Sequence, residues 1–107
     1  MTDDADYLGA VRAIAHPSRY KIIGWLLDPT AHFPPQKDGD LVEDGVCVAF
    51  ITDKLGLSQP TVTSHMRVLS DHGLVTSKKV KNWVFYKAHV SQILKVKTLF
   101  LDGIKPD

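Results

Sequence analysis

One stretch, GLSQPTVTSHMRVLSDHGLV at residues 56–75, limits the folds open to this chain more than any other feature. Its flanking glycines favour a turn before the central segment and a stop after it, at Gly73. Ser58 is a residue type that caps helices, and Pro60 is tolerated in a first helical turn. The apolar residues between them have helical spacing, so we predict a helix with one buried stripe, made of Val62, Met66 and Leu69.

A second helix is predicted just before this one, over residues 47–55, because Val48, Ile51 and Leu55 fall on one side of it. The link between the two helices is only residues 56–58. Two helices joined by a short turn, the second opening on small hydroxyl residues, are typical of a helix-turn-helix.

Small polar side chains lie opposite the apolar stripe of the predicted helix. At about 100° per residue, the outward side and its leading end hold Ser58, Gln59, Pro60, Thr61, Thr63, Ser64 and Arg67. Short hydroxyls let a helix approach a DNA backbone, glutamine pairs with adenine, and arginine pairs with guanine or a phosphate. We therefore assign these residues to DNA contact. A helix end that is polar only because it faces water explains the hydroxyls alone equally well.

Two strands are predicted after this helix, over residues 74–79 and 83–88, with Lys81-Asn82 at the turn. Trp83 and Tyr86 are expected to pack in the core or at the hinge of this hairpin. Three lysines near its tip could reach the neighbouring DNA backbone or minor groove: Lys78, Lys79 and Lys81. Residues 1–107 are thus predicted to form one winged helix-turn-helix domain, mainly α with a small β-hairpin wing.

Both ends of the chain are predicted to be helical. Residues 6–27 keep helical spacing with a break near His16-Pro17, and Ser18 is a plausible starter for the next helix. Residues 90–101 have an apolar face too wide for a free helix on the surface of a monomer. This last helix therefore predicts dimerisation.

Residues 28–45, which we call the acidic loop, contain three prolines, two glycines and five acidic residues. This composition predicts a long loop with at most a short strand near Leu41-Val42. The acids would repel DNA phosphates, so we expect the loop to lie away from any DNA-binding face.

The formal net charge is only +1, but it is unevenly distributed. Residues 1–57 carry five Lys/Arg against nine Asp/Glu, a net of −4, whereas residues 58–107 carry eight against three, a net of +5. The basic second half suggests a polyanionic partner. A single cysteine, no apolar run long enough for a bilayer and no secretory signal pattern predict a cytoplasmic protein with no membrane association.

Three segments resemble the ArsR/SmtB family of bacterial winged-helix repressors: AIAHPSRYKIIGWL (13–26), KLGLSQPTVTSHMRVLSDHGLV (54–75) and KKVKNWVFYKAH (78–89). The resemblance implies a homodimer that binds a palindromic operator in double-stranded DNA and blocks transcription. It adds His65 to the DNA-contacting segment that contains Gln59, Thr61, Thr63 and Ser64. It also implies a dimer interface on the first and last helices, to which we assign Leu8, Val11, Ile93, Val96, Leu99 and Phe100.

Two metal sites that are common in the resembled family are incomplete here. A Cys-x-Cys pair would need a second thiol at Ala49, and the last helix offers His89 without a second histidine or a nearby acid. We therefore predict no metal and no cofactor. Cys47 is expected to be a small buried apolar residue, with redox or ligand sensing as the alternative. The acids Asp38, Asp40, Glu43 and Asp44 do not match a calcium-binding EF-hand, and a solvated loop is favoured.

An enzyme is not expected, because the sequence has no nucleophile–base set, phosphate-binding glycine loop or paired carboxylates. Two other functions stay open at this point. The same fold could sense a metal or small molecule at an atypical site, either Cys47 or the acidic loop. A winged helix could also serve as a protein-interaction module, although the hydroxyls and arginine of the predicted recognition helix argue against it.

Overall fold

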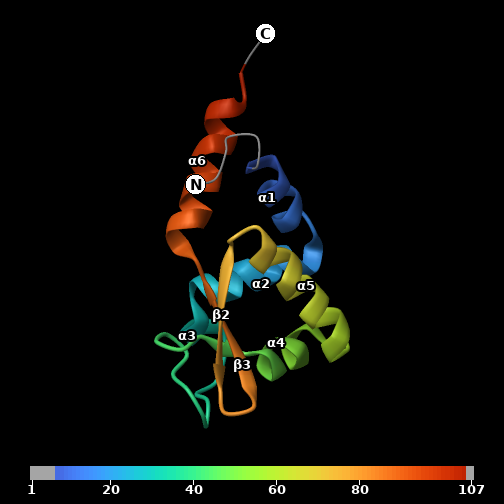
Figure 1. Ribbon diagram of the computed structural model, residues 1–107, viewed down its shortest axis with the longest axis vertical. Coiled ribbons are helices and arrows are strands. Elements are labelled where there is room, and N and C mark those ends of the chain that lie inside the picture. Colours follow the sequence, from blue (N-terminus) through green and yellow to red (C-terminus); the bar gives the residue numbers. More distant parts are fainter. Residues whose placement is uncertain (1–6, 106–107) are drawn as a thin grey trace.

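The computed structural model describes residues 7–105 and is mainly α-helical with one small sheet (Figure 1). This confirms the predicted fold class. The elements in chain order are α1 (Tyr7–Ile14), α2 (Pro17–Leu27), α3 (Pro29–His32), β1 (Val46–Cys47), α4 (Val48–Leu55), α5 (Gln59–Asp71), β2 (Val75–Val80), β3 (Trp83–Ala88) and α6 (Val90–Gly103).

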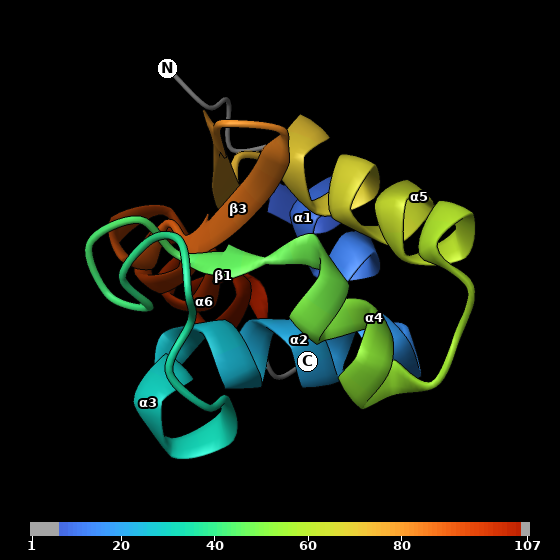
Figure 2. The same ribbon diagram turned by 90° about the horizontal axis from the view of Figure 1, so that it is seen from below.

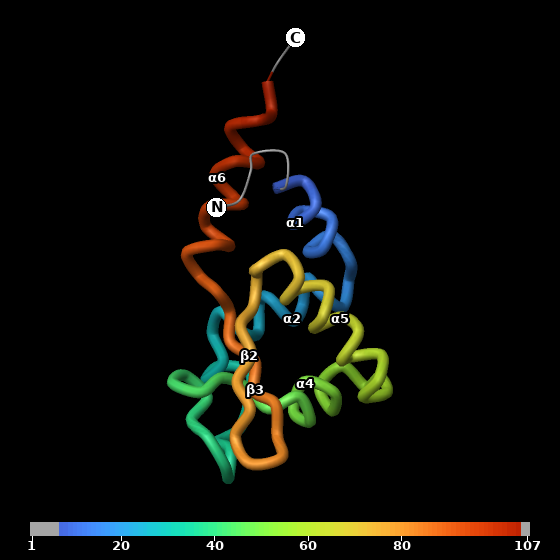
Figure 3. Tube along the Cα trace, viewed as in Figure 1, coloured from blue at the N-terminus to red at the C-terminus, as the bar shows by residue number. Residues whose placement is uncertain are grey.

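The predicted apolar stripe of α5 is the centre of the core. Val62, Met66 and Leu69 have no exposed surface, and they pack in one cluster with Ile22 of α2 and Ile51 of α4. Helices α1 and α6 pack on each other and extend together from this body, as the chain trace in Figure 3 shows. The molecule is therefore elongated, with the helix-turn-helix and the sheet at one end and a two-helix extension at the other.

Strands β2 and β3 form the predicted hairpin, which we call the wing (residues 75–88), and β1 pairs with the other edge of β3. Its turn is the predicted Lys81-Asn82, with Lys81 at a φ of 55°. Side chains alternate between two faces of the wing. The inner face carries the core residues Tyr86 and Ala88, and the outer face carries Lys78 and Phe85. In Figure 2, α5 and the acidic loop lie on opposite sides of the sheet.

The ends of α5 follow the local sequence signals. The Ser58 hydroxyl oxygen accepts a hydrogen bond from the Thr61 backbone N–H at 3.4 Å, as expected of a capping residue. Gly56 and Gly73 have φ values of 70° and 69°, the left-handed conformation that ends a helix. The predicted starter of α2 was wrong. His16 takes that place, and its Nδ1 accepts a hydrogen bond from the Ser18 N–H at 3.1 Å.

The acidic loop and the segment that follows it differ from their predictions in three ways. Its first part forms the short helix α3, and Leu41-Val42 lies in a turn rather than a strand. That turn exists because the Asp40 carboxylate accepts hydrogen bonds from the N–H groups of Val42 and Glu43. Cys47 belongs to β1 and not to a helix, since it pairs with Phe85 of β3, and α4 begins one residue later.

Two glycines give opposite predictions for stability. Gly45 has a φ of 101°, and a Cβ there would run into the backbone carbonyl of Tyr86. We expect Gly45→Ala to lower the free energy of unfolding by about 1–3 kcal/mol. Gly24, inside α2, has nothing within 4 Å of the place that an added Cβ would take, so Gly24→Ala should raise stability by about 0.5–1 kcal/mol. Urea unfolding measures the free energy of unfolding of both variants. Equal changes in the two variants would contradict the left-handed backbone conformation and close contact at Gly45.

Candidate nucleic-acid interface

The predicted DNA-contacting residues of α5 form one exposed surface opposite its buried stripe. Every member of this set is exposed: Ser58, Gln59, Pro60, Thr61, Thr63, Ser64 and Arg67. Two of the hydroxyls also serve the helix itself, because Ser58 Oγ donates to Thr61 Oγ1 at 2.9 Å. The side chains of Gln59, Thr63 and Ser64 form no hydrogen bond with any described residue. The polar groups of these three side chains are therefore available to bind DNA.

His65 lies apart from this surface. Its ring is partly buried, its Nδ1 lies 3.0 Å from an Arg19 guanidinium nitrogen, and its centroid is 4.7 Å from that of His16. Arginine only donates, so His65 Nδ1 accepts and the ring is neutral with its proton on Nε2. Burial, together with the charges of His16 and Arg19, lowers the pKa of His65 below its ordinary range. The contact ties α5 to α2, which favours a positioning role over base contact.

Two of the three wing lysines are paired with acids of the acidic loop. Lys78 Nζ lies 2.6 Å from Asp44 Oδ1, and Lys81 Nζ lies 2.9 Å from Asp38 Oδ1. The hydrogen bond from Lys78 is the main reason why the pKa of Asp44 is lowered. Lys79 forms no ion pair with any described residue. The acidic loop therefore contacts two of the lysines assigned to DNA contact, although it lies on the other side of the sheet from α5. That the loop lies away from the DNA-binding face stays a prediction.

Gln36 ties the acidic loop to its own end and to β1. Its Nε2 donates to the carbonyl of Gly45 at 2.9 Å, and its Oε1 accepts from the N–H of Cys47 at 2.7 Å. At Gly39, with a φ of 87°, a Cβ would lie 2.9 Å from the Phe85 ring, so the loop backbone passes directly over that ring. No local sequence signal marks Gln36, since all its partners depend on how the loop closes.

The predicted dimer-interface residues divide into two groups. Val96 is only 3% exposed, and Val11 and Ile93 pack against the same core, so these three stabilise the protomer itself. Leu99 is partly buried, whereas Leu8 and Phe100 are exposed. The sequence assignment omitted further exposed apolar residues of α6 and its end, which are Val90, Leu94, Leu101 and Ile104.

The candidate sensing residues are placed separately. Cys47 is a buried free thiol, as expected of a small apolar residue, and it lines a surface pocket together with Ala49. His89 Nδ1 lies 3.0 Å from the carbonyl of Gly73, so it links the end of α5 to the start of α6. Within residues 7–105, no three His, Cys, Asp or Glu side chains gather as a metal site would require. None of the helices in that range combines the length and apolar character that a membrane span needs.

Comparisons with known proteins agree with this geometry. The family model described as bacterial regulatory protein, arsR family, matches residues 41–77, which include α4, α5 and their turn. The HTH-type transcriptional regulator YbzH of Bacillus subtilis is 34% identical over 85 residues, spanning 79% of this chain and 85% of YbzH.

Solved structures share the fold. HlyU from Vibrio cholerae superposes with a TM-score of 0.64 at 22% identity, covering 92% of this chain and 94% of HlyU. The transcriptional repressor BigR from Xylella fastidiosa gives 0.61 at 17% identity, covering 95% and 90%. Proteins of the matching family are transcriptional regulators and not enzymes. The chain belongs to the arsR family of bacterial regulatory proteins, and it is a DNA-binding transcriptional regulator with a winged helix-turn-helix fold.

Proposed function

We propose that the protein is a homodimeric repressor that inserts α5 into the major groove of a palindromic operator. The observation that carries this proposal is the exposed polar surface of α5, on which Gln59, Thr63, Ser64 and Arg67 stand opposite a fully buried apolar stripe. The amide of Gln59 and the guanidinium of Arg67 suit base edges, and the hydroxyls suit phosphate oxygens. The positive N-terminal end of α5 adds attraction for phosphate.

The wing supplies the second contact in this proposal. Lys79, near the hairpin tip, has an ammonium group without an ion pair among the described residues, whereas Lys78 and Lys81 must exchange a carboxylate for a phosphate. His65 keeps only an indirect part, because its contact with Arg19 fixes the orientation of α5. We assign these lysines to phosphate contact, which raises affinity for all sequences alike.

The homodimer is supported by the apolar surface of the two-helix extension. Leu94, Leu101 and Ile104 are each more than half exposed, and Leu8 and Phe100 are exposed as well. A symmetric dimer would cover these side chains and present two copies of α5 to two half-sites. The repressor role is supported by BigR, a transcriptional repressor of the same fold. Because the proposed ligand is chromosomal DNA, we also propose a cytoplasmic location.

The proposed repressor does not use the Cys-x-Cys metal site of the family. Ala49 stands where that site needs a second thiol, and its methyl group cannot ligate a metal. An interaction module without DNA binding is disfavoured, because the exposed side of α5 carries hydroxyls, an amide and a guanidinium rather than apolar groups.

Removing α5 and wing contacts should have different effects. Lys79→Ala should weaken binding to every duplex and reduce the salt slope of log K by about one unit. Gln59→Ala should instead change the ranking of duplexes of different sequence. Fluorescence anisotropy at several salt concentrations measures both, with Lys95→Ala on the exposed surface of α6 as the matched charge control. If Lys95→Ala changes the salt slope as much as Lys79→Ala does, the wing assignment is wrong.

Neutralising the acids that pair with the wing should strengthen DNA binding. Asp44→Asn frees Lys78, so we expect affinity to rise about two- to fivefold at low salt and the salt slope to become steeper. Glu43→Gln removes the same charge from the same loop, but no ion pair involves Glu43 within the described residues. It is therefore the matched control. Equal gains from the two variants would mean that the loop acts only through its net charge.

A charge on the exposed apolar surface of α6 should separate the subunits. Leu94→Asp is expected to shift the protein toward monomers and to weaken operator binding at least about tenfold, because each half-site then binds alone. Val42→Asp places the same charge on an exposed apolar residue of the acidic loop and should leave the assembly unchanged. Sedimentation velocity measures the mass of both variants. A wild-type monomer at micromolar concentration would contradict the homodimer.

A further inference from the structure

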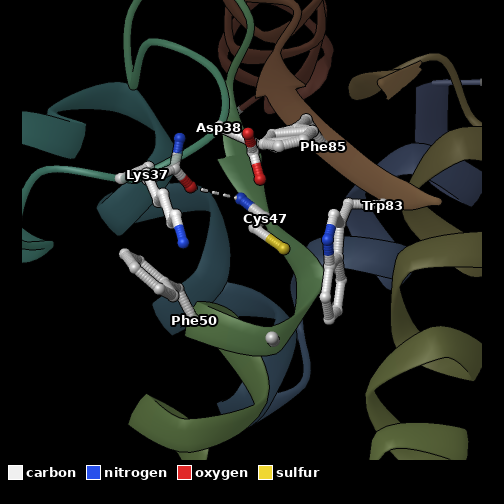
Figure 4. A pocket seen from close by; sticks show the side chains of 8 residues that line it. Lys37, Asp38, Cys47, Phe50, Trp83 and Phe85 are labelled. Atoms are coloured by element: carbon white, nitrogen blue, oxygen red, sulfur yellow. Dashed lines mark hydrogen bonds between the residues drawn. The ribbon is translucent and has the colours of Figure 1, made fainter. Parts of the chain in front are cut away.

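A pocket of about 210 Å³ opens between the acidic loop, the start of α4 and the outer face of the wing. Figure 4 shows Cys47 near its centre, with Lys37 and Phe50 on one side and Trp83 on the other. Phe85 also lines the pocket, beneath the loop backbone at Gly39. The pocket therefore lies between the loop that holds the wing lysines and the wing itself.

Of the three aromatic residues of this pocket, Phe50 packs against the main apolar cluster, whereas Trp83 and Phe85 lie outside it. Trp83 was expected to pack in the core or at the hinge, but 45% of it is exposed. Phe85 and Cys47 are buried, yet both are outside the main apolar cluster. A large indole left half exposed beside a phenyl group and a thiol is a surface that an apolar ligand can cover.

The volume limits the size of a ligand. A cavity of about 150 Å³ accepts one benzene molecule, and drug-sized ligands occupy about 300–1,000 Å³. The pocket therefore has room for one substituted ring. A flat ring that enters between Phe50 of α4 and Trp83 of β3 would contact both aromatic side chains.

The charges at the pocket limit the chemistry of that ligand. The Asp38 carboxylate is held by Lys81, and the Gln36 amide is held by the loop backbone and Cys47. Lys37, in contrast, forms no ion pair or hydrogen bond with any described residue. Its ammonium group is thus the polar group that a ligand can use. We propose that the pocket binds a small aromatic acid, a single planar ring bearing a carboxylate.

Such a ligand would also weaken DNA binding, and this part rests on the proposed function. The bound aromatic ligand would contact both the acidic loop and the wing in the arrangement that the structure shows. In that arrangement Lys78 and Lys81 are paired with Asp44 and Asp38. A ligand stabilises the conformation that it binds. DNA phosphates need the same lysines released, so the ligand and DNA favour opposite arrangements, and each lowers affinity for the other.

Binding is tested on the whole chain without DNA, by a benzoate titration followed in ¹H–¹⁵N NMR spectra. The indole N–H of Trp83 should shift and saturate, while that of Trp25, which does not line the pocket, should stay in place. Benzamide has the same ring without the charge and should bind several-fold more weakly. No saturable shift of Trp83, or equal shifts of both indoles, would overturn the pocket assignment.

Two variants test the assigned contacts. Lys37→Gln should weaken benzoate up to about fivefold, the strength of an exposed ion pair, and should leave benzamide unchanged. Trp83→Leu should weaken both probes, and its binding is followed through the backbone N–H signal of Phe50. Tyr20→Leu, at an exposed aromatic residue of α2 that does not line the pocket, should change neither. Benzoate binding that is insensitive to Lys37→Gln would overturn the acid specificity.

The coupling is measured separately, as the affinity for duplex DNA with and without saturating benzoate at constant ionic strength. We expect about a two- to fivefold loss, the strength of one or two exposed ion pairs, and no loss in Trp83→Leu. Unchanged affinity would overturn the coupling while leaving the pocket intact. Benzoate binding by a protein that binds no DNA would instead contradict the proposed function and leave the pocket assignment standing.

Discussion

Burial of one face of α5 is the constraint on which the rest of the structure depends. Val62, Met66 and Leu69 are fully buried, and each contributes roughly 1.5–3 kcal/mol relative to an exposed position. This burial fixes the rotation of the helix, since a shift of one residue would turn it by about 100°. The polar surface with Gln59 and Arg67 is exposed because the apolar stripe on the opposite side of α5 is fixed in the core. The Arg19–His65 contact adds a polar restraint to the same orientation.

Two lysines of the wing pair with acids of the acidic loop, and we propose that the same lysines bind DNA phosphates. Lys78 and Lys81 pair with Asp44 and Asp38 across more than thirty residues of sequence, and the loop that carries the acids is held by Gln36. These exposed pairs are individually weak, so DNA phosphates can compete with them. In the function that we propose, the acidic loop lowers DNA affinity without touching DNA, because its acids occupy two of the lysines assigned to phosphate contact.

Local signals predicted most of the fold. Ser58, Gly56 and Gly73 each act through their own backbone, so capping and left-handed geometry could be inferred without tertiary information. Residues with non-local partners were harder to place. Cys47 lies in a strand only because β3, far along the chain, pairs with it. His16 caps α2 in place of Ser18, a choice between neighbours that spacing does not distinguish.

The candidate DNA-binding site was likewise predictable where it depends on local sequence and not where it depends on distant contacts. The exposure of the α5 residues follows from helical periodicity, which is a property of the sequence alone. Three other features depend on where the acidic loop lies: the ion pairs of the wing lysines, the hydrogen bonds of Gln36 and the exposure of Trp83. Its position follows from contacts such as Gly39 over Phe85, which no local pattern encodes.

We propose that the exposed face of α5 recognises DNA sequence, in two copies related by symmetry. Selection of bound duplexes from a random pool, followed by sequencing, tests it most directly. We predict an enriched palindrome whose half-sites are about one helical turn apart, from centre to centre. A pool with no enriched motif after selection at low salt would contradict this claim.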